Sequence, residues 1–172
     1  MAREIETKCI HLEEEENSIN HYGAISYPIY QSATYAHPGV GQSTGYDYSR
    51  LQNPTNDYVA AKIAELEGGA AAMLTSSGQA ANFFALFNIC ECGSHIVASS
   101  SIYGGTYNLI PVTLAKMGIR ATFVSPDCTE EELNAAFTED TRAVFGETIA
   151  NPALTVLDIE KFAKAAHAHG VP

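Results

Sequence analysis

The sequence predicts an α/β fold in which a largely parallel sheet carries helices on both faces. Three observations lead to this prediction: apolar runs of strand length recur along the chain, segments with helical periodicity lie between them, and the two kinds alternate at nearly even spacing. In sheets of this kind ligands bind at the carboxyl ends of the strands. The loops that follow the predicted strands are therefore where function is expected.

The predicted strands are short apolar runs, and the predicted helices lie between turn and cap signals. We expect strands at residues 70–74, 96–98, 121–124 and 143–145. We expect helices at about residues 57–66, 79–87, 106–116, 130–137 and 158–169. Residues 169–172 read as a helix stop that leads into another strand. We therefore expect the chain to be the N-terminal portion of a longer protein, truncated on its C-terminal side.

The composition fits one globular domain and narrows the choice of partners. The chain has 172 residues, of which 46% are hydrophobic and 17% charged, as in well-packed proteins. A net charge of −11 with only nine Lys and Arg disfavours a nucleic-acid or anionic-membrane surface. No run approaches the roughly 20 apolar residues of a spanning helix, and the acidic start does not resemble a signal peptide. We expect a cytoplasmic protein whose partners are small molecules or other subunits.

The first 45 residues differ from the rest of the chain. Glycines and prolines interrupt any period, and residues 13–16 are four glutamates. Aromatic residues such as Tyr27, Tyr30 and Tyr35 are nevertheless too frequent for a disordered tail. We predict that residues 1–45 form an irregular arm that packs on a neighbouring subunit, and that residues 46–172 form the main domain.

The cysteines and histidines give no metal signal. The four cysteines lack the C-x-x-C spacing of metal or redox sites, and Cys90 and Cys92 are expected to end a helix as reduced thiols. His167 and His169 stand two residues apart, and such residues do not face each other on a helix. We expect both histidines at a helix C-terminus, ahead of Gly170.

The stretch from residue 70 to residue 87 predicts a strand, a tight turn and a helix N-terminus. The first N–H groups of such a helix lack intrahelical partners and lie at the positive end of the helix dipole, so they favour an anion such as phosphate. Gly78 allows close backbone approach, and the hydroxyls of Ser76 and Ser77 can bind the anion or cap the helix. An ordinary capped turn that binds nothing is the alternative.

Tyr48 and Arg50 precede a predicted helix whose cap is Thr55 or Asn56. They alternate in what looks like extended chain, so both side chains are expected to point the same way. A guanidinium beside a phenol suits a phosphate, because one gives bidentate charge-assisted bonds and the other a single hydroxyl donor. The alternative is a surface arginine stacked on a tyrosine.

Two further strand-end loops carry unusual chemistry. Tyr103 stands beside two glycines after the strand at residues 96–98, and Glu147 and Asn151 follow the strand at residues 143–145. With the phosphate-type turn, these loops describe a pocket for a flat, phosphorylated, heteroaromatic ligand: Tyr103 stacks on the ring, and Glu147 and Asn151 supply polar contacts.

Several motifs, spread over almost the whole chain, carry a family resemblance. They are Tyr48-Ser49-Arg50 with Asn53-Pro54-Thr55, Leu66-Glu67-Gly68-Gly69, Ser76-Ser77-Gly78-Gln79-Ala80, Tyr103-Gly104-Gly105-Thr106-Tyr107 and Glu147-Thr148-Ile149-Ala150-Asn151-Pro152. Together they resemble the Cys/Met-metabolism family of pyridoxal-phosphate enzymes, which includes cystathionine γ-synthase, cystathionine lyases, methionine γ-lyase and O-acetylhomoserine sulfhydrylase. The resemblance implies the three-layer αβα architecture of a fold type I large domain, with pyridoxal 5'-phosphate as cofactor.

Carried over to this chain, the resemblance implies roles for particular residues. Ser77 and the backbone amides of Gly78 and Gln79 would hold the cofactor phosphate. Tyr48 and Arg50 would reach that phosphate from the adjacent subunit, which makes a dimer the minimal unit and a tetramer the expected assembly.

The resemblance also implies which residues approach the cofactor ring. Tyr103 would stack on it and take part in proton transfer as a catalytic residue. Asn151 would contact the ring hydroxyl, with Glu147 in support. None of the five lysines, at positions 8, 62, 116, 161 and 164, stands in the family's context for the lysine that binds the cofactor. No catalytic lysine is therefore assigned.

The resemblance implies replacement at the γ-carbon of O-acetylhomoserine by sulfide or methanethiol, as part of a longer enzyme. Gly105 stands where many bacterial methionine γ-lyases carry a cysteine, and the motif around it looks more like the sulfhydrylases. A carbon–sulfur lyase of the methionine or cystathionine type and a cystathionine γ-synthase remain alternatives. A second alternative is an inactive fragment that acts only as a structural or oligomerisation module.

Overall fold

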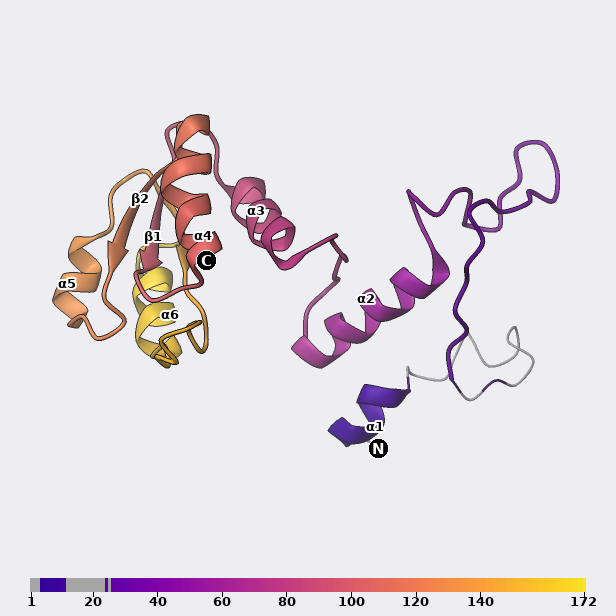
Figure 1. Cartoon of the computed structure of the whole chain (residues 1–172), viewed down its shortest axis with the longest axis horizontal. Helices are drawn as coiled ribbons and strands as arrows, with labels where there is room; N and C mark the ends of the chain where they lie inside the picture. Colours follow the sequence, from indigo (N-terminus) through magenta and orange to yellow (C-terminus); the bar gives the residue numbers. More distant parts are fainter. Residues whose placement is uncertain (1–3, 12–23, 25) are drawn as a thin grey trace. The chain divides into compact units, whose positions relative to one another are not determined.

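The computed structural model describes residues 4–11, 24 and 26–172 (Figure 1). The chain forms two compact units, residues 1–74 and 75–172, and each is described by itself. The glutamate run at residues 13–16 lies outside the described residues.

The C-terminal unit is built on a parallel three-stranded sheet. Its strands are β1 (His95–Ser99), β2 (Arg120–Val124) and β3 (Thr141–Phe145), in the order β2-β1-β3. In the register, Ile96 pairs with Ala121 on one side and with Ala143 on the other. All five residues of β1 are buried, as expected for a central strand with both faces covered. The predicted strands at residues 96–98, 121–124 and 143–145 are confirmed.

Helices pack on both faces of this sheet. On one face Ile96 and Ala98 join a buried cluster with Leu86 of α3 (Gly78–Ile89) and Ile110 and Leu114, which follow α4 (Gly104–Asn108). On the other face Val97 packs with Leu133 of α5 (Glu130–Ala135) and with Phe162 of α6 (Ile159–Ala168). Successive residues of β1 point to opposite faces, so the strand contributes to both clusters. The predicted α/β layers are confirmed.

The helical stretch after β1 is less regular than predicted. It begins as α4, widens into a π-helical turn at η1 (Leu109–Thr113) and ends as the 3₁₀ turn η2 (Leu114–Met117). Pro111 lies inside η1. A proline has no N–H to donate and its ring crowds the carbonyl four residues back, so a wider turn accommodates it better than an α-helix does. The predicted helical segment at about residues 106–116 is therefore confirmed in extent, but only its first part, α4, is α-helical.

Residues 70–74 do not form the predicted strand. They run in an extended or bent path without ladder partners among the described residues, and Met73 is 76% exposed. Apolar character alone does not make a strand, because a strand needs a neighbour for its backbone groups. At the other end of the chain, the N–H of Val144 in β3 donates to the carbonyl of Pro172 at 2.9 Å.

Among its described residues, the N-terminal unit has the helices α1 (Ile5–Ile10) and α2 (Pro54–Glu67). Residues 1–45 were predicted to be irregular throughout, so the helix α1 is a correction to that prediction. The cap of α2 is Asn53, whose side chain accepts the N–H of Thr55, whereas Thr55 or Asn56 was predicted. Thr55 instead accepts the N–H of Tyr30 at 2.8 Å. Proline directly after the cap is favoured at the first helical position, which places the start of α2 earlier than expected.

The helix ends agree with the predictions for cysteine and histidine. Cys90 is the C-cap of α3, and the four cysteines are free. His167 lies in the last turn of α6 and His169 is its C-cap, followed by Gly170 at φ 72°. Within the described part of the chain, no three His, Cys, Asp or Glu side chains gather as metal ligands, and no helix is long and apolar enough to cross a membrane.

Candidate active site

The N-terminus of α3 presents unpaired backbone donors. Ser77 caps the helix, because its Oγ accepts the N–H of Ala80 at 3.1 Å, and Thr75 Oγ1 donates to the carbonyl of Ser77 at 2.9 Å. The amides of Gly78 and Gln79 donate to no group among the described residues. Gly78 is exposed, and a Cβ at this position would meet nothing within 4 Å. Two helix N–H groups in open surroundings suit an anion.

Tyr103 and Glu147 meet at the carboxyl end of the sheet. Tyr103 follows β1 and Glu147 follows β3, and these two strands are parallel neighbours. The backbone N–H of Tyr103 donates to Glu147 Oε1 at 3.0 Å. Tyr103 is 48% exposed, so the residue is accessible to a ligand. The carboxylate of Glu147 holds the backbone from which this ring projects.

A buried hydroxyl connects α3 with the turn that carries Tyr103. Thr106 is fully buried in α4, and its Oγ1 donates to Gln79 Oε1 at 3.3 Å and accepts from Asn82 Nδ2 at 3.0 Å. Neither Thr106 nor Asn82 was predicted from the sequence as a site residue. The available signal was the i, i+3 spacing of Gln79 and Asn82, which places two amides on one helix face.

Gly105 makes room for this arrangement. A Cβ at this position would overlap the amide nitrogen of Gln79 and would lie 2.5 Å from Cε1 of Tyr103. By contrast, a Cβ at the adjacent Gly104 would meet nothing within 4 Å. The close approach of the Tyr103 ring and the Gln79 side chain therefore depends on the missing side chain of Gly105.

Asn151 is exposed in the turn after β3. The loop around it is closed by a bridge between Ile149 and Val156 and by the N–H of Ala150, which donates to the carbonyl of Thr155 at 2.9 Å. No hydrogen bond joins Asn151 to Tyr103 or Glu147 in the part of the chain that the structure describes.

Tyr48 and Arg50 lie in the N-terminal unit. Tyr48 forms an antiparallel bridge with Thr34, but the N–H groups of Leu51 and Gln52 both donate to its carbonyl. The chain therefore turns after Tyr48 and does not stay extended to Arg50 as predicted. The turn brings the two side chains together, with the Arg50 guanidinium carbon 4.9 Å from the centre of the Tyr48 ring. This is the stacked pair that the sequence analysis kept as an alternative. Such a pair remains able to receive a phosphate at the free edge of the guanidinium.

Three of the five lysines are engaged in local contacts. Lys62 is buried and donates to Glu65 at 2.7 Å and to the carbonyl of His11. Lys161 donates to the carbonyls of Pro126 and Cys128 at 3.0 and 2.8 Å, and Lys164 faces Glu130 at 3.4 Å. The ammonium groups of these three lysines are therefore engaged by nearby protein groups.

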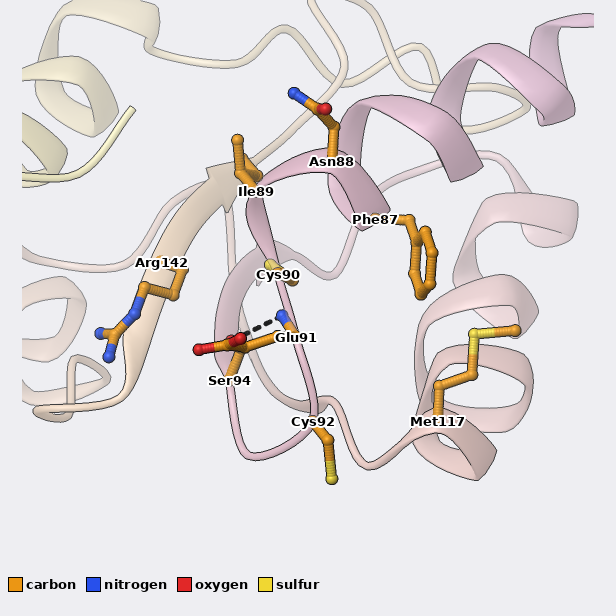
Figure 2. A pocket seen from close by; sticks show the side chains of 9 residues that line it. All are labelled: Phe87, Asn88, Ile89, Cys90, Glu91, Cys92, Ser94, Met117 and Arg142. Carbon is orange, nitrogen blue, oxygen red and sulfur yellow. Dashed lines mark hydrogen bonds between the residues drawn. The ribbon is translucent and has the colours of Figure 1, made fainter.

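A separate groove of about 680 Å³ lies at the opposite end of the strands (Figure 2). Phe87 and Met117 lie on one side of it and Arg142 on the other, with the N–H of Glu91 donating to Ser94 Oγ between them. The residues around Ser94 precede β1, whereas Tyr103 and Glu147 follow strands. The groove is therefore not part of the candidate site.

Two free amides at a helix N-terminus, a half-exposed aromatic ring and a carboxylate at the carboxyl edge of a parallel sheet are features of α/β proteins that bind a phosphorylated heteroaromatic cofactor. The comparison with known proteins agrees with this class. The chain belongs to the Cys/Met metabolism PLP-dependent enzyme family, whose profile matches residues 6–172. This confirms the family suggested by the sequence motifs and, at the level of the family, pyridoxal phosphate as the cofactor.

Relatives in the family include both synthases and lyases. The chain is 39% identical over 180 residues to a homocysteine/cysteine synthase of Saccharomyces cerevisiae, a match that covers 100% of this chain and 40% of the relative. It is 42% identical over 149 residues to a cystathionine gamma-lyase of Bacillus subtilis, covering 87% and 39%. The chain thus spans about two fifths of the length of these relatives.

A solved structure supports the fold. A Campylobacter jejuni protein described as an O-acetylhomoserine (thiol)-lyase, whose crystal structure contains a pyridoxyl-lysine, superposes with a TM-score of 0.84 at 35% identity. The match covers 96% of this chain and 42% of that protein. The predicted fold type I architecture is therefore confirmed.

Proposed function

We propose that this chain forms the cofactor-phosphate and ring-stacking part of a pyridoxal-phosphate enzyme that replaces the γ-substituent of O-acetylhomoserine with sulfide or methanethiol. The observation that carries the proposal is the pair of free amides at Gly78 and Gln79, linked through the Gln79 side chain to the turn that bears Tyr103. The names of the yeast and Campylobacter relatives support the choice of reaction.

The residues fit the cofactor as follows. The phosphate binds the N–H groups of Gly78 and Gln79 at the positive end of α3, and the Ser77 hydroxyl still has its own proton to donate, because in the cap it acts only as an acceptor. Tyr103 covers one face of the ring and its hydroxyl moves a proton near the substrate amine. Glu147 holds the Tyr103 backbone. Asn151 contacts the ring hydroxyl.

When bound, pyridoxal phosphate serves as an electron sink that stabilises negative charge next to the substrate amine. This chemistry also needs a lysine, and none of the five lysines of the chain is assigned that role. We propose that the phosphate site is completed by Tyr48 and Arg50 of an adjacent subunit, so that a homodimer is the minimal unit and a tetramer the working assembly. We also propose that the protein acts in the cytoplasm.

Gly105 favours the proposed replacement over a methionine γ-lyase reaction, because many bacterial methionine γ-lyases carry a cysteine at this position. A cysteine would put its Cβ against the Gln79 amide and the Tyr103 ring. The lyase alternative is nevertheless supported by the cystathionine gamma-lyase relative. The two are distinguished by incubating the purified protein with cystathionine or methionine in the absence of an added thiol. Release of ammonia and a keto acid would favour the lyase, whereas thiol-dependent consumption of O-acetylhomoserine supports the proposed replacement.

The alternative of an inactive module is tested by mass spectrometry. Borohydride reduction of the purified protein in the presence of pyridoxal phosphate fixes any lysine–cofactor linkage covalently, and intact-mass analysis then detects the adduct. A pyridoxyl adduct supports an enzyme. A protein without an adduct and without turnover would leave only the structural role.

A further inference from the structure

Thr106 joins the two parts of the candidate site through one buried hydroxyl. It lies in α4, three residues after Tyr103, and its side chain is completely buried. The hydroxyl donates to Gln79 Oε1 at 3.3 Å and accepts from Asn82 Nδ2 at 3.0 Å. A hydroxyl has one proton to donate, and this one is given to Gln79. The start of α3 and the start of α4 are therefore tied together by specific bonds.

The turn from Tyr103 to Thr106 is held at both ends. At one end the Tyr103 amide is bound by Glu147, and at the other end Thr106 is bound by the two side chains of α3. Between them, the Gln79 amide and the Tyr103 ring both lie where a Cβ at Gly105 would stand. The same residue, Gln79, offers its backbone N–H to an anion while its side chain holds the turn.

We propose that Thr106 is a positioning residue that fixes the Tyr103 ring relative to the N-terminus of α3, so that one ligand meets the helix amides with its phosphate and the tyrosine with its ring. The inference rests on the proposed function, since it takes pyridoxal phosphate as that ligand. A free phosphate needs only the helix amides. Loss of the Thr106 hydroxyl should therefore weaken the binding of pyridoxal phosphate and spare that of inorganic phosphate.

The test compares three variants of the purified protein. Thr106→Val removes the hydroxyl and keeps the shape, Thr106→Ser keeps the hydroxyl, and Asn82→Ala removes one partner from the α3 side. Thr141→Val is the matched control, because Thr141 is a buried threonine whose hydroxyl bonds to His95 at 2.9 Å at the start of β3, away from the candidate site. Binding of pyridoxal phosphate is followed by absorbance and by the circular dichroism of the bound cofactor, and binding of inorganic phosphate by calorimetry.

We expect Thr106→Val to lower the affinity for pyridoxal phosphate about tenfold and to change the dichroism of the bound cofactor, with phosphate affinity unchanged. Asn82→Ala should act in the same direction, Thr106→Ser should restore both signals, and Thr141→Val should leave both unchanged. Unaltered cofactor affinity and dichroism in Thr106→Val and Asn82→Ala would overturn the positioning role and leave the proposed function standing. Equal loss of phosphate and pyridoxal phosphate would also overturn it. A wild-type protein that binds neither would overturn the proposed function, and the inference with it.

Discussion

Adding one methyl group at Gly105 should destabilise the protein, whereas the same change at its neighbour should not. Gly104 and Gly105 both lie in α4, so replacing either by alanine reduces the entropy of the unfolded chain and favours the helix by roughly 0.4–1 kcal/mol. At Gly104 the new Cβ has open space around it. At Gly105 it overlaps the Gln79 amide and lies 2.5 Å from the Tyr103 ring.

Relief of the overlap at Gly105 requires neighbouring side chains to move. The Gln79 side chain is held by Thr106, and the Tyr103 backbone is held by Glu147, so relief requires the ring to swing or the Thr106 bond to break. Forcing an extra methyl group into a packed site typically costs about 1–3 kcal/mol. We therefore expect Gly104→Ala to be neutral or stabilising, and Gly105→Ala to be about 1–3 kcal/mol less stable than Gly104→Ala.

The assay is urea unfolding of the two variants and the wild type, followed by far-ultraviolet circular dichroism and analysed with a common slope. A cofactor titration on the same samples adds a second readout, because a displaced Tyr103 ring should also weaken pyridoxal-phosphate binding. Equal unfolding free energies for Gly104→Ala and Gly105→Ala, together with equal cofactor affinities, would refute the packing described here for Gly105.

Three further predictions address the phosphate, the tyrosine and the interior. Arg50→Ala should weaken cofactor binding by about 2–5 kcal/mol in the assembled protein, because it removes a charge-assisted contact to a phosphate. Arg142→Ala, a change in the groove before β1, serves as the control. Equal cofactor affinity in the two variants would remove Arg50 from the site. Tyr103→Phe should retain the cofactor and lower turnover by about 10²–10⁴-fold if the hydroxyl transfers a proton, so full turnover would show that only stacking matters. Burial, assisted by the charge of Arg120, lowers the pKa of His95 below its ordinary value of 6.5. As the pH falls, His95 therefore binds a proton at a higher pH in the unfolded chain than in the folded chain. The stability that neutral His95 provides should be complete above about pH 6.5 and should be lost as the pH falls through the lowered pKa. Urea unfolding from pH 5 to pH 8 checks this, and a His95→Gln variant should lose that part of the pH dependence; an identical pH profile in both proteins would contradict the assignment.

The three strands of the sheet could be predicted from the sequence, because each is marked by a short run of apolar residues. Ile96 to Ala98 and Ala143 to Phe145 are short apolar runs, and the structure places both in parallel strands, the first fully buried and the second partly buried. Residues 70–74 show the limit of this reasoning. They are just as apolar, but they have no ladder partner among the described residues, and pairing depends on segments that are distant in sequence.

Two local details were not predicted: the irregular turns of the helical segment after β1, and the turn that follows Tyr48. Pro111 was visible in the sequence, yet its effect is to widen one turn and not to end the helix. Around Tyr48, alternation of residue types suggested extended chain, but the Tyr48 carbonyl accepts two N–H groups and closes a turn. In both segments the local path of the chain depends on backbone hydrogen bonds.

The sequence by itself determined the α/β class, because turn glycines, cap residues and apolar runs act over a few positions. The family, and with it the residues proposed to meet the cofactor, followed from the resemblance of the sequence motifs. The sequence also predicted that Tyr103 and Glu147 would share one edge, since neighbouring parallel strands end on the same side. Only the tertiary structure revealed that Thr106 joins Gln79 and Asn82, and that Gly105 is required by the packing of Tyr103. Those relations are contacts between side chains of different elements, and their distances depend on how the helices pack on the sheet and not on the spacing of residues along the chain.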